Sequence, residues 1–124
     1  MCMVMRSVTV TDDDLERAFH ALADASRRAM VVRLVEGPAS VSELAAPLDL
    51  RLPTVMQHLD VLQRGGLVRT EKVGRVRTCR LQPARLRDVE EWTASHRRTW
   101  ERRLDLLDDV LDQAFPEDDE GTTR

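Results

Sequence analysis

The sequence has few cysteines and no long apolar segment. Cys2 and Cys79 are the only cysteines among 124 residues, and they form no Cys-x-x-Cys pair. We therefore expect no structural disulfide, because isolated thiols in a chain without an export signal are normally reduced. No apolar run approaches the ~18 residues that a membrane-spanning helix needs. The first residues also lack a long apolar segment with a small-residue cleavage site. These absences predict a cytoplasmic protein without a membrane partner.

The residue patterns of enzyme active sites are also missing. The sequence offers no nucleophile paired with a base, no glycine-rich phosphate loop and no two carboxylates that would face one pocket. We therefore expect neither an enzyme nor a bound cofactor.

Length and composition predict one folded domain. With 124 residues, 42% hydrophobic and 33% charged, the chain can build a single core. We expect a flexible segment at 1–10, a folded domain at 11–115 and an acidic, disordered tail at 116–124. The periodicities described below predict a mainly α fold with a small β-hairpin, an α+β arrangement.

Charge is segregated along the chain. Residues 50–87 contain nine arginine or lysine residues and two acidic ones, a net charge of +7, although the whole chain carries −3. The compensating acids lie at 12–16 and at 105–120. An even scatter would indicate a merely solvated surface, whereas a positive middle segment suggests a polyanion as partner.

Residues 52–64, LPTVMQHLDVLQR, have the pattern of a short helix with one apolar side. At 100° per residue one stripe contains Leu52, Val55, Leu59 and Leu62. The opposite side contains Pro53, Thr54, Gln57, Val61 and Arg64. Pro53 suits a first helical turn, and the glycines at 65–66 end the helix. Most amphipathic helices face only water, but a helix with a small polar outer face can also read base edges in a DNA major groove.

Three shorter helices are predicted before this segment. The first starts at Thr11, the second is capped by Asp24 or Ser26, and the third by Ser40 or Ser42. The apolar set expected for the second helix is Ala29, Met30, Val32, Leu34 and Val35. For the third, Val41, Leu44, Ala45 and Leu48 are expected to face inward. A turn at 49–51 then leads into the helix at 52–64, which completes a helix-turn-helix.

A β-hairpin is predicted directly after this helix. The segments LVRTEKV and RVRTCRL alternate with period two on either side of Gly74, which predicts two strands and a tight turn. Lys72, Arg75 and Arg77 cluster at its tip, where they can reach phosphates or the minor groove. A basic hairpin in this place is typical of a winged helix.

The last helix is predicted to cover about 84–115. Its apolar positions are Leu86, Val89, Trp92 or Thr93, His96, Trp100, Leu104, Leu107, Leu111 and Ala114. A continuous helix of this length spans ~48 Å, more than the core of so small a domain can cover. A second copy of the chain is the simplest source of the missing apolar surface. We expect a dimer through the first and last helices, formed by Leu15, Phe19, Val89, Trp92, His96, Trp100, Leu104, Leu107 and Leu111.

Several motifs together resemble the ArsR-type (SmtB-like) winged-helix transcriptional repressors, most closely their metal-independent branch. The matching motifs, within about residues 15–112, are Leu22-Ala23-Asp24 with Arg27-Arg28, His58-Leu59 with Leu62, Gly66-Leu67-Val68, Gly74-Arg75 and a Trp-containing charged last helix. The resemblance implies a homodimer that binds double-stranded DNA at a palindromic operator and represses its own or a neighbouring gene. The chain departs from the family at Arg51 and Met56, where serine is frequent, and this leaves the operator sequence undetermined.

The expected DNA contacts combine this resemblance with the placement of the residues. They are Arg51, Pro53, Thr54, Gln57, His58, Arg64, Lys72, Arg75 and Arg77. Thr54 and Gln57 are expected to read bases, and the cations to contact phosphates. For His58 a structural role and a phosphate contact are equally open.

Two alternatives remain beside the DNA-binding repressor. One is a sensor switched by a metal or by thiol chemistry at Cys79, which lies near Arg77 and Arg80. Metal-sensing relatives carry Cys-x-Cys before the recognition helix or His/Asp sets on the last helix, whereas this chain has no cysteine at 42–46 and only His96 in the last helix. We expect no metal site, because zinc wants three or four ligands, although a dimer could bring two His96 side chains together. The other alternative is a winged helix that binds only proteins. The sequence identifies no effector.

Overall fold

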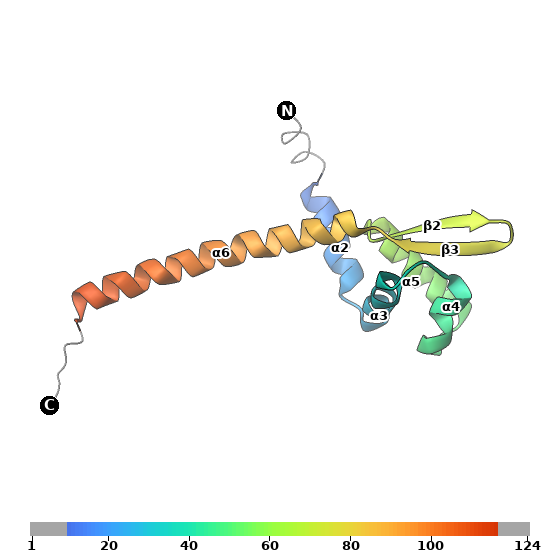
Figure 1. Ribbon diagram of the computed structural model, residues 1–124, viewed down its shortest axis with the longest axis horizontal. Coiled ribbons are helices and arrows are strands. Elements are labelled where there is room, and N and C mark those ends of the chain that lie inside the picture. Colours follow the sequence, from blue (N-terminus) through green and yellow to red (C-terminus); the bar gives the residue numbers. More distant parts are fainter. Residues whose placement is uncertain (1–9, 117–124) are drawn as a thin grey trace. The chain divides into compact units, whose positions relative to one another are not determined.

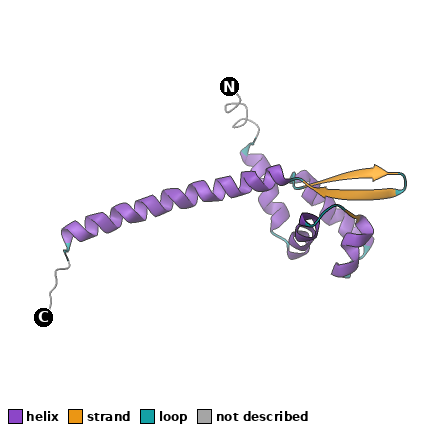
Figure 2. Ribbon diagram, viewed as in Figure 1, coloured by secondary structure: helices purple, strands orange, loops and turns teal. Residues whose placement is uncertain are grey.

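The structure, a computed structural model, describes residues 10–116 (Figure 1). They divide between two units, with residues 10–89 in the first and residues 90–116 in the second. Nearly all of the predicted flexible start and acidic tail, and Cys2, lie outside the described residues. The elements are α2 (Asp12–Leu22), α3 (Ala25–Val35), β1 (Ala39–Ser40), α4 (Val41–Ala45), a 3-10 turn η1 (Ala46–Leu48), α5 (Leu52–Arg64), β2 (Val68–Val73), β3 (Val76–Leu81) and α6 (Pro83–Ala114). The mainly helical fold with a basic hairpin is confirmed (Figure 2).

Side chains at the helix starts define where the first helices begin. Thr11 and Ser40 each form a capping box, with Asp14 and Glu43 respectively, and Asp24 accepts a hydrogen bond from the Arg27 backbone N–H. Asp24 and Ser40 are therefore the caps, rather than Ser26 and Ser42. These side chains satisfy backbone donors that the first turn of a helix leaves unpaired.

The same hydrogen bonds make the caps sensitive to acid. The Thr11 backbone N–H lowers the pKa of Asp14, and the backbone N–H groups of Arg27 and Ser40 lower the pKa of Asp24 and of Glu43. A carboxyl whose pKa is lower in the folded state stabilises the fold above its unfolded pKa of about 4. The three carboxylates therefore stop contributing as the pH falls through their lowered pKa values.

The core of the first unit combines α2, α3, α4, α5 and the sheet. Its largest fully buried side chains are Met30, Leu44, Val55, Leu59, Leu62, Leu67 and Cys79. On α3 the core side is formed by Met30, Val31 and Leu34, whereas Val32 and Val35 are exposed. The predicted apolar set of this helix was therefore wrong in part, because an aliphatic-rich helix does not reveal which of its sides meets the core.

Two residues of α5 also differ from the prediction. Leu52 is 52% exposed, because it stands at the first position of the helix, one turn before α5 reaches the core at Val55. Val61, predicted on the outer face, packs against the core instead. Three buried aliphatics, Val55, Leu59 and Leu62, hold the helix, rather than the expected four.

The sheet has three antiparallel strands in the order β1-β3-β2. The predicted hairpin is confirmed, with Val73 opposite Val76 and Gly74 at φ 65° in the turn. Strand β1 was not predicted, since it has two residues. Ala39 lies opposite Cys79 and Ser40 opposite Thr78, so β1 attaches the start of α4 to the hairpin.

The last helix is continuous. α6 has 32 residues without a break, and none of its residues is buried. None of the helices in the described residues is both long and apolar enough to cross a membrane.

Candidate nucleic-acid interface

Two glycines follow the last residue of helix α5, and each has a different structural role. Gly66 takes φ +76°, a left-handed conformation that favours glycine. Gly65 lies against α2, where an added Cβ would come within 3.0 Å of Ala21 Cβ and of the Arg17 carbonyl oxygen. Any larger residue at 65 would push α2 and α5 apart, so the close contact of these helices depends on this glycine.

The outer face of α5 presents small and polar groups. Pro53, Gln57 and Arg64 are exposed, whereas Thr54 is partly buried. Arg64 Nε lies 3.1 Å from Asp60 Oδ2, and both side chains remain largely in solvent. Arg51 is the N-cap residue of α5 but makes no side-chain capping bond. Arg51 is exposed at the start of the helix and forms no ion pair among residues 10–116.

The hairpin carries its positive charge at the turn. Lys72 and Arg77 are opposite each other in the register, and Arg75 lies in the turn; all three are exposed. Within residues 10–116, none of the three has an acidic side chain within 4.0 Å. Nearer the base of the hairpin, Arg80 Nε lies 3.2 Å from Glu71 Oε1. The three cations nearest the turn are thus the part of the hairpin whose positive charge has no acidic partner in the described residues.

A side-chain bond joins the hairpin to α5. Gln63 Nε2 donates to Thr70 Oγ1 over 3.0 Å. Sequence reasoning missed this pair, although the alternation of β2 places Thr70 on the same side of the strand as the buried Val68. The bond couples the position of the hairpin to the end of α5.

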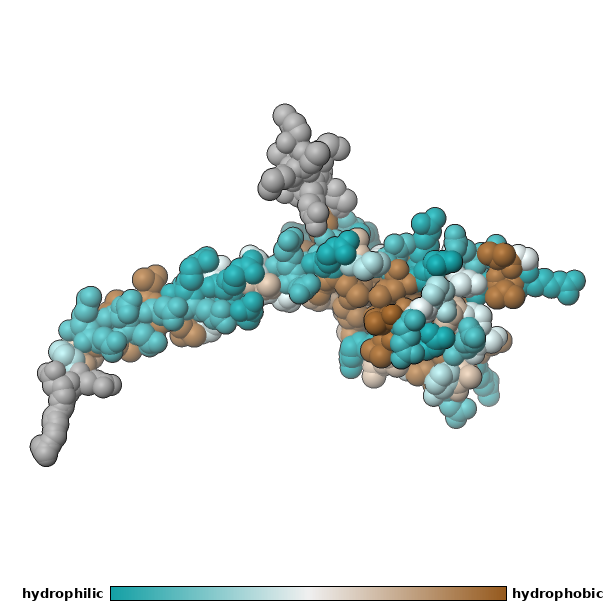
Figure 3. Space-filling view, in the orientation of Figure 1, coloured by the Kyte–Doolittle hydropathy of each residue, from teal (hydrophilic) through white to brown (hydrophobic). Residues whose placement is uncertain are grey.

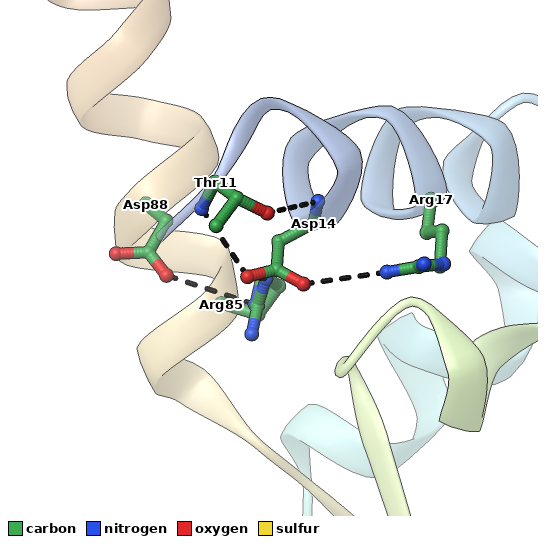
Figure 4. Close-up of polar contacts among 5 residues, drawn as sticks. All are labelled: Thr11, Asp14, Arg17, Arg85 and Asp88. Atoms are coloured by element: carbon green, nitrogen blue, oxygen red, sulfur yellow. Dashed lines mark hydrogen bonds and ion pairs between the residues drawn. The ribbon is translucent and has the colours of Figure 1, made fainter. Parts of the chain in front are cut away.

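One arginine of the basic segment is structural. Arg85 Nη1 lies 3.7 Å from Asp14 Oδ2, and Arg85 Nε lies 3.6 Å from Asp88 Oδ2 (Figure 4). Asp14 also accepts from Arg17 and from the Thr11 backbone N–H. An added Cβ on Gly66 would come within 3.0 Å of Arg85 Nε. Arg85 therefore joins the start of α6 to α2 and to the end of α5.

The three histidines differ in their surroundings. His58 is partly buried, and its Nδ1 lies 3.2 Å from Arg27 Nη1, so it has the structural contact that was one of its two open roles. His96 stacks on Trp92 with ring centroids 4.3 Å apart, and its Nδ1 lies 2.8 Å from the Trp92 carbonyl oxygen. His20 is exposed on α2. The described part of the chain contains no group of three or more His, Cys, Asp or Glu side chains that could hold a metal.

The thiol of Cys79 does not fit a redox sensor. Its side chain is fully buried in the core, and burial raises its pKa, while Arg77 opposes this effect. A reactive thiol needs access to solvent and a lowered pKa. The alternative of a thiol sensor at Cys79 is therefore not supported by the surroundings of this side chain, because burial outweighs the charge of Arg77.

The residues predicted for a dimer interface lie in both units. In the first unit Leu15 and Val89 are partly buried and Phe19 is 37% exposed. In the second unit Trp92, Trp100, Leu104, Leu107 and Leu111 are exposed, as is His96. Hydrophobic side chains appear at the surface at several places along α6 and again near the hairpin turn, where Val73 and Val76 are exposed (Figure 3).

Known proteins that are similar to this chain have a helix-turn-helix or winged helix-turn-helix domain. A family model described as a helix-turn-helix domain matches residues 22–71. The crystal structure of the ArsR family transcriptional regulator RHA00566 superimposes with a TM-score of 0.70 at 46% identity, covering 74% of this chain and 95% of that one. The homodimeric winged helix-turn-helix DNA-binding domain of Mb0332 from Mycobacterium bovis superimposes with a TM-score of 0.55 at 26% identity, covering 74% and 82% of the two chains.

Two curated relatives match over shorter segments. The HTH-type transcriptional regulator Rv2034 of Mycobacterium tuberculosis is 46% identical over 71 residues, which are 57% of this chain and 66% of the relative. The biofilm growth-associated repressor of Agrobacterium fabrum is 43% identical over 51 residues, which are 41% of this chain and 44% of the relative. The match thus spans less than two thirds of the length of either relative.

Proposed function

This chain belongs to the ArsR family of transcriptional regulators, and we propose that it acts in the cytoplasm as a repressor that binds a palindromic operator as a homodimer. The observation that carries the proposal is the combination of α5, whose outer face is small and polar, with a hairpin tip whose cations, Lys72, Arg75 and Arg77, lack acidic partners among residues 10–116. The Agrobacterium relative, named as a repressor, supports the direction of regulation.

In this proposal α5 lies in the major groove and the hairpin follows the backbone. Thr54 and Gln57 face base edges, where a glutamine amide can bond adenine in a bidentate manner. Arg51 and Arg64 lie at the two ends of the helix. There they can contact the phosphates of the two DNA strands that border the major groove. Lys72, Arg75 and Arg77 contact phosphates or enter the minor groove.

The dimer is supported by the apolar and charged pattern of α6. Trp100, Leu104, Leu107 and Leu111 recur at intervals of three and four residues, and all are exposed. Residues 97–103 contain four arginines and one glutamate, whereas residues 105–112 contain four aspartates. An antiparallel pairing of two such helices brings opposite charges together, and a parallel pairing brings like charges together. The DNA-binding domain of Mb0332, which is homodimeric, supports a homodimer but does not bear on how the two helices pair.

Selection of bound fragments from the genome that encodes the protein tests the proposal. We expect the purified full chain to retain fragments that share one inverted repeat, with half-sites about 10 bp apart or a multiple of that spacing. Fluorescence anisotropy with the best fragment and a scrambled version then measures specificity. Retention of random fragments, or of none, would contradict the proposed function.

Replacing Arg75 by alanine is expected to reduce the salt dependence of DNA binding. The plot of log K against log salt has a negative slope, and the loss of one phosphate contact makes this slope less steep by about 1. Binding to specific and to random DNA is weakened alike. Anisotropy titrations at several salt concentrations measure this slope. Arg87→Ala provides the control, because Arg87 is also an exposed arginine but lies on α6, outside α5 and the hairpin. An unchanged slope for Arg75→Ala would remove the hairpin tip from the DNA contacts.

A further inference from the structure

The motif Leu22-Ala23-Asp24 with Arg27-Arg28 has no place on the DNA-facing surface described above. The structure places it at the junction of α2, α3 and α5. The Asp24 carboxylate accepts from the Arg27 backbone N–H, and Arg28 Nη1 donates to the Leu22 carbonyl oxygen over 2.8 Å. These two contacts are local and account for how α3 starts, but they leave the Arg27 side chain to be explained.

The Arg27 guanidinium makes three contacts outside its own helix. Its Nε donates to the Ala21 carbonyl oxygen over 2.8 Å, and its Nη2 donates to the His20 carbonyl oxygen over 3.1 Å. Both carbonyls belong to the last turn of α2, where the His20 carbonyl oxygen also accepts from the Ala23 backbone N–H. The third nitrogen, Nη1, lies 3.2 Å from His58 Nδ1 on α5. One planar group therefore bridges the end of α2 and the middle of α5.

The direction of the third bond follows from the chemistry of the two side chains. A guanidinium has only donors, so His58 Nδ1 must be the acceptor. This geometry requires a ring without hydrogen on Nδ1. The planar guanidinium of Arg27 is held in orientation by its two bonds to carbonyl oxygens of α2. Its bond to His58 Nδ1 therefore restricts both the distance and the orientation of the His58 ring relative to α2.

The position of His58 on α5 determines what this bond controls. His58 directly follows Gln57, is four residues from Thr54, and precedes the buried Leu59. The buried aliphatics prevent α5 from leaving the core, but aliphatic contacts are not directional. A rotation of the helix by about 20° about its axis would move the tip of Gln57 by about 2 Å, given a radius of about 5–6 Å with side chains. Base-edge hydrogen bonds do not tolerate such a shift.

We propose that Arg27 and His58 are positioning residues for base recognition, and that their hydrogen bond sets the rotation of α5 against α2. This rests on the proposed function, since it presupposes that α5 reads a major groove. It assigns His58 to the inside of the protein rather than to a phosphate. Loss of the bond then reduces binding to the operator, while binding to random DNA, which depends on phosphate contacts, stays the same.

The test compares two replacements of His58. Leucine has a similar volume but no acceptor, whereas asparagine can place its Oδ1 near the position of Nδ1. We expect His58→Leu to lose about tenfold in operator affinity at an unchanged salt slope, and His58→Asn to recover to within about threefold of the natural protein. Anisotropy with operator and scrambled DNA measures both, and thermal unfolding, recorded in parallel, reports the folded fraction.

Two arginine variants provide the matched comparison. Arg27→Met is expected to show the same selective loss as His58→Leu, and the double variant to lose no more than the worse single variant, because both remove one interaction. Arg28→Met is the control, since Arg28 bonds to the Leu22 carbonyl oxygen and forms no hydrogen bond or ion pair with α5 among the described residues. If Arg27→Met does not fold, the two His58 variants decide the question alone.

The outcomes separate this inference from the proposed function. If the natural protein prefers no operator, the proposed function itself fails. If it does prefer one, and folded His58→Leu binds that operator equally well, the inference is overturned. It is also overturned if His58→Leu lowers the salt slope, which identifies a phosphate contact, or if Arg28→Met loses as much specificity as Arg27→Met.

Discussion

Replacing Leu104 and Leu107 together by aspartate is expected to convert the proposed dimer into a monomer and to weaken operator binding at least 100-fold. The two side chains are 39% and 51% exposed in the single chain, so the substitutions do not disturb a core. In the proposed dimer we expect them to be buried against the second copy, where an unpaired carboxylate is strongly unfavourable. A monomer also loses the gain of 10²–10⁴ that two linked half-site contacts provide.

Leu106→Asp is the matched control for this experiment. Leu106 is 64% exposed and lies about 100° around the helix from Leu107, outside the predicted stripe. Sedimentation or light scattering measures the mass in solution, and anisotropy measures operator affinity. A double variant that remains dimeric, or a monomeric natural protein with full operator affinity, would disprove the role assigned to α6.

Replacing Gln57 by alanine is expected to remove the preference for one base pair in each half-site. The Gln57 side chain is exposed and its amide can bond a base edge, and the loss of such a contact costs about 1–3 kcal/mol of discrimination at that position. Alanine is a good helix former, so α5 itself should not be weakened. Binding to a panel of operators with single base-pair changes identifies the affected position.

Gln113→Ala controls for the chemical change alone. Gln113 is an exposed glutamine of α6 in the second unit, and its replacement should leave the whole panel unchanged. The base-reading role of Gln57 would be disproved if Gln57→Ala ranked all operators as the natural protein does. A uniform loss across the panel would instead indicate a contact with the DNA backbone.

Local interactions made much of the fold predictable from the sequence. Helix starts at Thr11 and Ser40, the left-handed end of α5 at Gly66 and the hairpin turn at Gly74 all depend on residues within a few positions of one another. The strong periodicity of residues 84–115 likewise predicted α6. Charge segregation pointed to a polyanion, and the motif combination pointed to the family that the comparisons then established.

Local patterns were less informative about which side of an element is buried. Val32, Val35 and Leu52 have the composition of core residues, yet they are exposed, whereas Val61 packs inward. Burial depends on where the neighbouring helices lie, and this information is absent from the period of a single helix. Cys79 shows the same limit, because the arginines beside it in the sequence suggested activation, but the surrounding core raises its pKa.

The sequence by itself determined the helices that carry the site, the hairpin with its turn, and the location of positive charge, because each depends on neighbouring residues. Only the tertiary structure decided which cations remain available for a partner. It engaged Arg85 with Asp14, 71 positions away, and Arg27 with His58, 31 positions away. Such contacts form only when the core brings distant segments together, since the pairing of two side chains depends on the packing of the helices that carry them.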